Sequence, residues 1–113
     1  MSQSEWEQQL FTVILHAGNA RSNAKEAQEY ATERDWEKAQ ALIDEANDEV
    51  VLAHKSNVEI IQKEAKGEKV EFSVLLVHAL DLLVLAWSEI DFAEQFINLN
   101  KRVAALEDKV AEG

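Results

Sequence analysis

The chain has 113 residues, 22 acidic against 11 basic side chains and a formal net charge of −11, which disfavours nucleic acid and anionic membranes as partners. Hydrophobic residues make up 47% of the sequence, too many for a disordered acidic tail, and the length suggests one domain. Cysteine and proline are absent, which excludes disulfides, cysteine-ligated zinc and thiol catalysis and favours helices over turn-rich β architectures.

A first helix is predicted over residues 4–33, because apolar residues recur there at spacings of three and four. Ser4 followed by Glu7 has the pattern of a capping box. Gly18 interrupts the apolar face, and we expect another helix to approach closely at this glycine. The stripe predicted to face the core consists of Trp6, Leu10, Val13, Ile14, Ala17, Ala20, Ala24, Ala27 and Ala31.

A second helix is predicted over residues 36–66. Asp35 is a favourable N-cap for it and follows a polar turn at residues 32–35. Gly67 is the residue type that most often ends a helix in the left-handed conformation. The apolar stripe of this helix consists of Ala39, Ile43, Ala46, Val50, Ala53, Asn57 and Ile60.

A third helix is predicted over residues 73–110, with Ser73 as its cap. Residues 74–87 are apolar on every side except at His78 and Asp81. Two other helices cannot surround such a helix, so we expect copies of the chain to associate through it. In the second half of this helix the apolar residues form a narrower stripe, with the alternating three- and four-residue spacing of a coiled coil. They are Phe92, Phe96, Leu99, Val103, Leu106 and Val110.

We expect neither a signal peptide nor membrane insertion. The N-terminus lacks the basic region that precedes a signal sequence. The longest apolar stretch, residues 74–87, is shorter than the roughly 20 residues that cross a bilayer. Together with the absence of cysteine, these two expectations favour the cytoplasm. The three predicted helices favour an all-α protein with one domain over residues 1–113.

His78 and Asp81 are the candidates for chemistry, because they are the polar residues of the apolar block and occupy neighbouring positions on one helical face. A carboxylate buried there without a partner would cost several kcal/mol. Three interpretations remain open: a structural His–Asp hydrogen bond, a metal site built from symmetry-related copies, and catalysis with neutral imidazole as nucleophile. Spacing alone favours the first.

Five short segments of the chain match segments of one known protein family. They occur in the same order, and the spacing between them is almost the same. They are residues 18–22 (GNARS), 35–39 (DWEKA), 53–55 (AHK), 61–70 (IQKEAKGEKV) and 73–79 (SVLLVHA). Together they resemble the lactose/cellobiose-type enzyme IIA family of the bacterial sugar phosphotransferase system, and the resemblance runs from about residue 11 to residue 102.

This resemblance implies a three-helix, up-down-up bundle that assembles as a homotrimer through the third helix. It implies that His78 accepts a phosphoryl group from the histidine-containing phosphocarrier protein and passes it to a cysteine of enzyme IIB. It also implies that Asp81 points to the trimer axis, where three copies share one divalent cation such as Mg²⁺. No organic cofactor is implied.

Around His78 the chain departs from the family's usual run, since Leu80, Leu82 and Leu85 stand where glutamine, histidine and threonine are usual. Each lost side chain could have supported a phosphoryl group, so we expect a drier trimer core and impaired transfer. The alternative function is a catalytically impaired or engineered trimeric scaffold with a leucine-rich core. A third interpretation, an acidic adaptor for a basic partner, has no motif behind it.

Three other polar residues receive structural interpretations. We expect His54 to be a structural histidine on the second helix and His16 to face solvent beside the stripe of the first. We expect Arg21 to form a surface ion pair.

Overall fold

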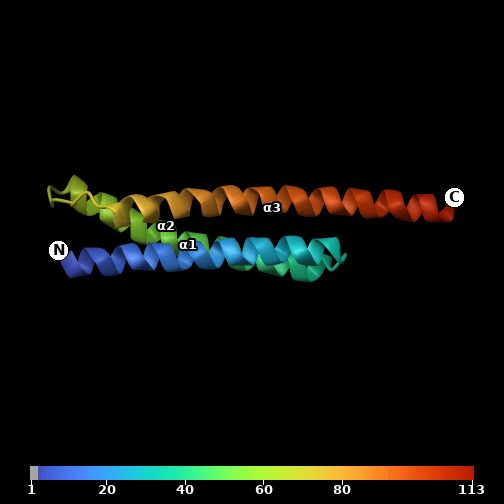
Figure 1. The fold of residues 1–113 in the computed structure, drawn as a ribbon, viewed down its shortest axis with the longest axis horizontal. Coiled ribbons are helices and arrows are strands. Elements are labelled where there is room, and N and C mark those ends of the chain that lie inside the picture. The colour runs from blue at the N-terminus through green and yellow to red at the C-terminus, as the bar shows by residue number, and fades with distance from the viewer. Residues whose placement is uncertain (1–2) are drawn as a thin grey trace.

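The computed structural model describes residues 3–113, which form three α-helices: α1 (Gln3–Thr32), α2 (Trp36–Ala65) and α3 (Val74–Glu112). The chain runs along the bundle in α1, returns in α2 and runs forward again in α3 (Figure 1). The bundle is elongated, measuring 67 × 21 × 17 Å. The predicted all-α, three-helix, up-down-up fold is confirmed, and each helix ends within one or two residues of the expected position.

Asp35 and Ser73 cap α2 and α3 as predicted, whereas the capping box predicted at Ser4 is wrong because Ser4 lies within α1. The Asp35 carboxylate accepts a hydrogen bond from the Lys38 backbone N–H at 3.2 Å, and the Ser73 hydroxyl accepts one from the Leu76 N–H at 3.0 Å. Gly67 follows α2 with φ of +96°, a conformation that side chains disfavour. Local sequence therefore determines where α2 begins and ends and where α3 begins.

Replacing Asp35 with alanine is expected to lower the free energy of unfolding by about 1 kcal/mol, because the Lys38 N–H loses its acceptor. Urea denaturation measures the change. Asp48→Ala is the matched control, since Asp48 is exposed within the body of α2, and we expect a change within about 0.5 kcal/mol there. Equal losses in the two variants would show that the cap contributes nothing of its own.

The core is apolar throughout, because no polar or charged residue among those described is buried. On α1 its middle consists mostly of alanines, which let the neighbouring helices approach closely. The expectation for Gly18 was wrong: Gly18 is exposed, and nothing lies within 4 Å of the position that a Cβ would take. The fully buried alanines that make the close contacts on α1 are Ala17, Ala20, Ala24, Ala27 and Ala31.

The three interfaces of the bundle are unequal. α1 packs extensively on both α2 and α3, whereas α2 and α3 contact each other least. Hydrogen bonds join α1 and α2 at the edge of their interface. The Gln9 side-chain amide donates to the Ser56 carbonyl at 3.1 Å and to the Glu59 carboxylate at 2.9 Å. α1 is therefore the central element of the fold.

α3 has two apolar faces, of which one is unpartnered in the single chain. Its inner face packs on the bundle through Ala79, Leu83, Ala86, Ile90, Ala93, Ile97 and Ala104. Phe96 is half-buried, because it packs against the core while its ring also stacks on the exposed Phe92 with centroids 6.2 Å apart. The other face, the outer stripe of α3, consists of Asp81 and the exposed apolar residues Leu85, Phe92, Leu99, Val103, Leu106 and Val110.

α3 is also longer than the other helices, and its C-terminal end runs past the turn between α1 and α2 (Figure 1). Arg34 in that turn ties the extension down through a hydrogen-bonded ion pair with Asp108 at 2.8 Å and a longer one with Glu107 at 3.5 Å. In the part of the chain that the structure describes, no helix is both long enough and apolar enough to span a bilayer.

Candidate functional site

His78 lies in the second turn of α3, and Asp81 lies one turn further along the same helix. Both side chains are exposed, and neither forms a hydrogen bond or ion pair with another described residue. The structural His–Asp hydrogen bond, which the spacing favoured, is therefore wrong. Both side chains point out of the bundle from successive turns instead of toward each other, so Asp81 is not buried by its own chain.

The neighbours of His78 on its own helix are apolar apart from Asp81. Val74 precedes it by four residues, and Leu82 and Leu85 follow it by four and seven. Val74 and Leu85 are exposed, while Leu82 packs partly against the core. On α3 the imidazole thus stands on an open apolar surface with one carboxylate beside it.

An ion pair further along α3 holds this helix against α1. The Arg21 guanidinium donates through Nε to the Glu89 carboxylate at 2.9 Å, and this hydrogen bond raises the pKa of Arg21. Both side chains are about one-third exposed, so the expected surface ion pair is confirmed. Because α1 and α3 run in the same direction and Arg21 is level with Glu89, His78 lies level with the turn of α1 that contains Leu10.

The other two histidines lie away from His78. The His54 ring packs on Trp87 with centroids 5.2 Å apart and the planes tilted by 58°, which agrees with a structural role. The expectation that His16 faces solvent was wrong, because its Nδ1 lies 2.6 Å from a Glu49 carboxylate oxygen and the imidazole is half-buried. The partner comes from α2, so no pattern within the first helix could reveal it.

Within residues 3–113, no three histidine, aspartate or glutamate side chains lie close enough together to hold a metal ion. A metal site that includes Asp81 would therefore need carboxylates from further copies of the chain. Asp81 is open to such copies, since it lies on the unpartnered outer stripe of α3.

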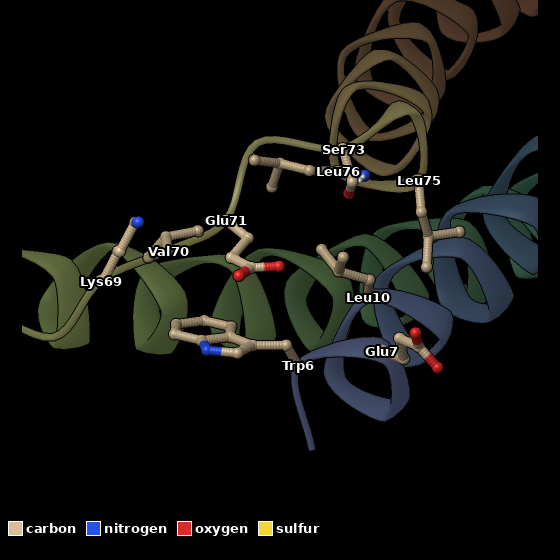
Figure 2. A pocket seen from close by; sticks show the side chains of 9 residues that line it. All are labelled: Trp6, Glu7, Leu10, Lys69, Val70, Glu71, Ser73, Leu75 and Leu76. Carbon is tan, nitrogen blue, oxygen red and sulfur yellow. Dashed lines mark hydrogen bonds between the residues drawn. The ribbon is translucent and has the colours of Figure 1, made fainter. Parts of the chain in front are cut away.

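A cavity of about 220 Å³ lies at the end of the bundle, between the start of α1 and the connection that leads into α3 (Figure 2). No sequence pattern predicted this cavity. Trp6 and Leu10 were expected only as core residues, and the connection that covers them has no periodic pattern. The apolar walls of the cavity are Trp6, Leu10, Val70, Leu75 and Leu76.

Residues 8–101 match the family model described as the PTS system, Lactose/Cellobiose specific IIA subunit. The chain belongs to this enzyme IIA family. It is 42% identical over 99 residues to the lichenan-specific phosphotransferase enzyme IIA component of Bacillus subtilis, covering 88% of this chain and 90% of that protein. It is 34% identical over 92 residues to the lactose-specific EIIA component of Staphylococcus epidermidis, covering 81% and 88%.

Solved enzyme IIA structures have the same fold. The crystal structure of the cellobiose-specific enzyme IIA from Bacillus anthracis superimposes with a TM-score of 0.87 at 41% identity, covering 93% of this chain and 94% of that one. PtcA from S. mutans superimposes with a TM-score of 0.85 at 32% identity, covering 89% and 99%. His78 and Asp81 both lie within the region that matches the enzyme IIA family model.

Proposed function

We propose that this enzyme IIA chain is a cytoplasmic phosphocarrier whose acceptor is His78. A neutral imidazole nitrogen of His78 attacks the phosphorus of the phosphohistidine on the phosphocarrier protein. The donor P–N bond breaks as a new P–N bond forms, and the donor imidazole leaves. A cysteine thiolate of enzyme IIB then attacks the same phosphorus, so that a P–S bond forms and His78 is released.

The observation that carries this proposal is the exposure of His78 without a polar partner in its own chain. An imidazole needs an unoccupied ring nitrogen to attack phosphorus and an exposed ring to meet a second protein. The half-buried His16 ring contacts Glu49 through Nδ1, and the exposed His54 ring packs on Trp87. Among the described residues, His78 is the histidine with neither a polar nor an aromatic side-chain partner, which supports it as the acceptor.

The same proposal includes a homotrimer assembled through the outer stripe of α3. This stripe leaves large apolar side chains uncovered, and Leu85, Phe92, Leu99 and Leu106 recur at intervals of seven residues, the period of a coiled coil. Packing three outer stripes together would cover these side chains. It would also bring three Asp81 carboxylates to the axis.

A divalent cation such as Mg²⁺ fits that place, because carboxylate oxygens are the protein ligands that this ion prefers. Three Asp81 carboxylates would hold the ion, which would supply the positive charge that offsets their repulsion. No part of the proposed phosphoryl transfer passes through the cation. Its role is to stabilise the assembly.

A second candidate is a trimeric scaffold of the same fold in which transfer is impaired. Leu80, Leu82 and Leu85 favour it, because these aliphatic side chains near His78 cannot donate hydrogen bonds to phosphoryl oxygens. The scaffold requires the same outer stripe as the phosphocarrier. The two candidates therefore differ in phosphate uptake and agree in oligomeric state.

Incubation with the phosphorylated phosphocarrier protein, followed by intact-protein mass measurement, tests the transfer. We expect the chain to gain one phosphoryl group, to lose it in acid as a phosphoramidate does, and to gain none after His78→Ala. His54→Ala is the matched control and is expected to be phosphorylated as the parent chain is. A parent chain that stays unmodified would favour the scaffold, and uptake by the His78→Ala variant would exclude His78 as acceptor.

A further inference from the structure

The cavity at the end of the bundle is formed by three separate segments of the chain. Trp6 and Leu10 of α1 form one wall, Leu75 and Leu76 of the first turn of α3 form another, and the connection at Val70 and Glu71 crosses above them (Figure 2). Trp6 and Leu10 are themselves buried, and Val70, Leu75 and Leu76 pack against the core. The walls are thus held by the bundle.

The volume of this cavity sets the size of a ligand. An apolar cavity of about 150 Å³ in a protein core stays dry and binds benzene. At about 220 Å³, the present cavity has room for a six-membered ring and a short chain. A sugar ring would not suit it, because hydroxyl groups against the apolar walls would lose their hydrogen bonds to water.

One charged group points into the cavity. In Figure 2 the Glu71 carboxylate lies over the space between Trp6 and Leu10, whereas the Lys69 ammonium and the Glu7 carboxylate point away. Glu71 forms no hydrogen bond or ion pair with another described residue. The Lys63 ammonium lies 6.0 Å from the centre of the Trp6 ring, and Lys63 is not among the residues that line the cavity.

We propose that this cavity binds a small amphipathic amine, with an apolar ring between Trp6 and Leu76 and an ammonium group paired with Glu71. The apolar walls bind the ring by removing it from water. The carboxylate selects a cation over a neutral or anionic molecule, and the net charge of −11 favours the approach of a cation.

The site is separate from the surface assigned to assembly. It lies on the side of α3 that packs against the core, whereas the outer stripe begins at Asp81 on the opposite face. It does not include His78, although Leu75 lies one helical turn before that residue. Binding of the amine therefore depends neither on the proposed phosphoryl transfer nor on the proposed trimer.

Titration of the ¹⁵N-labelled full chain with phenethylamine, followed by amide and indole NMR shifts, tests the site. We expect saturable shifts at Trp6 and at Leu75 and Leu76, with a Kd on the order of 1 mM for so small a ligand. The neutral isostere 2-phenylethanol is expected to bind about threefold to fivefold more weakly, because Glu71 is open to solvent and the ion pair is partly screened. Phenylpropionate is expected to bind more weakly still.

Two variants separate the contribution of the apolar ring to binding from that of the charge. Glu71→Gln is expected to weaken the binding of phenethylamine by about threefold to fivefold and to leave the affinity for 2-phenylethanol unchanged. Leu76→Phe is expected to fill the cavity and to abolish the binding of both ligands. Circular dichroism checks that this variant is folded. Glu64→Gln, an exposed carboxylate on α2 outside the cavity, is the matched control and is expected to change neither affinity.

Three results would overturn the proposal. They are shifts that fail to saturate at Trp6, equal affinity for phenethylamine and phenylpropionate, and undiminished binding in a folded Leu76→Phe variant. Each result is independent of phosphate uptake, because none of the titrations uses the phosphocarrier protein.

Discussion

Replacing Leu99 with glutamate is expected to convert the proposed trimer into monomers. Leu99 lies in the middle of the outer stripe of α3, and 55% of its surface is exposed in the single chain. Assembly would bury the exposed half of this side chain, which is worth about 1 kcal/mol for each leucine, because complete burial is worth about 1.5–3 kcal/mol. Three glutamates at one axis would lose that contribution and repel one another as well. Size-exclusion chromatography with light scattering measures the mass.

Leu15→Glu is the matched control for this substitution. Leu15 is exposed to a similar extent, 58%, but lies on α1 outside its buried stripe. We expect this variant to remain a trimer at the same protein concentration. A trimeric Leu99→Glu variant, or a monomeric parent chain, would contradict assembly through the outer stripe.

Replacing Ile43 with alanine is expected to lower the free energy of unfolding by about 2–5 kcal/mol. Ile43 is 1% exposed and is among the largest fully buried side chains of the core. Truncation removes buried apolar surface and leaves a cavity that the surrounding helices fill only in part. Urea denaturation followed by circular dichroism measures the loss.

Ile61→Ala on the same helix is the control, because Ile61 is 55% exposed. We expect it to change the free energy of unfolding by less than about 1 kcal/mol. Both variants must be compared at one protein concentration, since association of the folded chain would add to its apparent stability. Equal losses at the two positions would mean that the core lies elsewhere than described.

The helices of this chain could be predicted because their signals are local. Asp35 and Ser73 cap helices with their own side chains, and Gly67 takes a left-handed conformation that favours glycine. The buried stripe of α1 could be predicted because its alanines repeat with the helical period. These features depend on residues a few positions apart, which is the range over which a sequence pattern carries information.

Features that depend on another helix could not be predicted in the same way. His16 lies on the side of α1 where α2 supplies Glu49, and the spacing of apolar residues in α1 says nothing about that partner. The sequence pattern around Gly18 predicts a close helix contact, but none is present at that position. An exposed glycine and a glycine in a close helix contact interrupt an apolar stripe in the same way, so the sequence does not distinguish them. Phe96 packs against the core as well as on Phe92, and the alternating spacing in α3 does not reveal the core contact.

The candidate site was predictable in part. His78 and Asp81 were identified because charge and imidazole are rare in an apolar block, and the structure places them on successive turns of one helix. The absence of a hydrogen bond between them was not predictable from spacing, since side chains three residues apart can both point outward. The cavity beneath Val70 was beyond the sequence, because it needs three segments brought together by the fold.

The unequal interfaces of the bundle have a consequence for how a newly made chain folds on the ribosome. α1 and α2 share the largest interface and emerge first, so they can pair as a helical hairpin before α3 has been synthesised. α2 and α3 contact each other least, so α3 has little to pack on until α1 is in place. The helix that carries His78 is then the last of the three to dock, and the histidine becomes part of a folded surface only after α1 and α2 have been made.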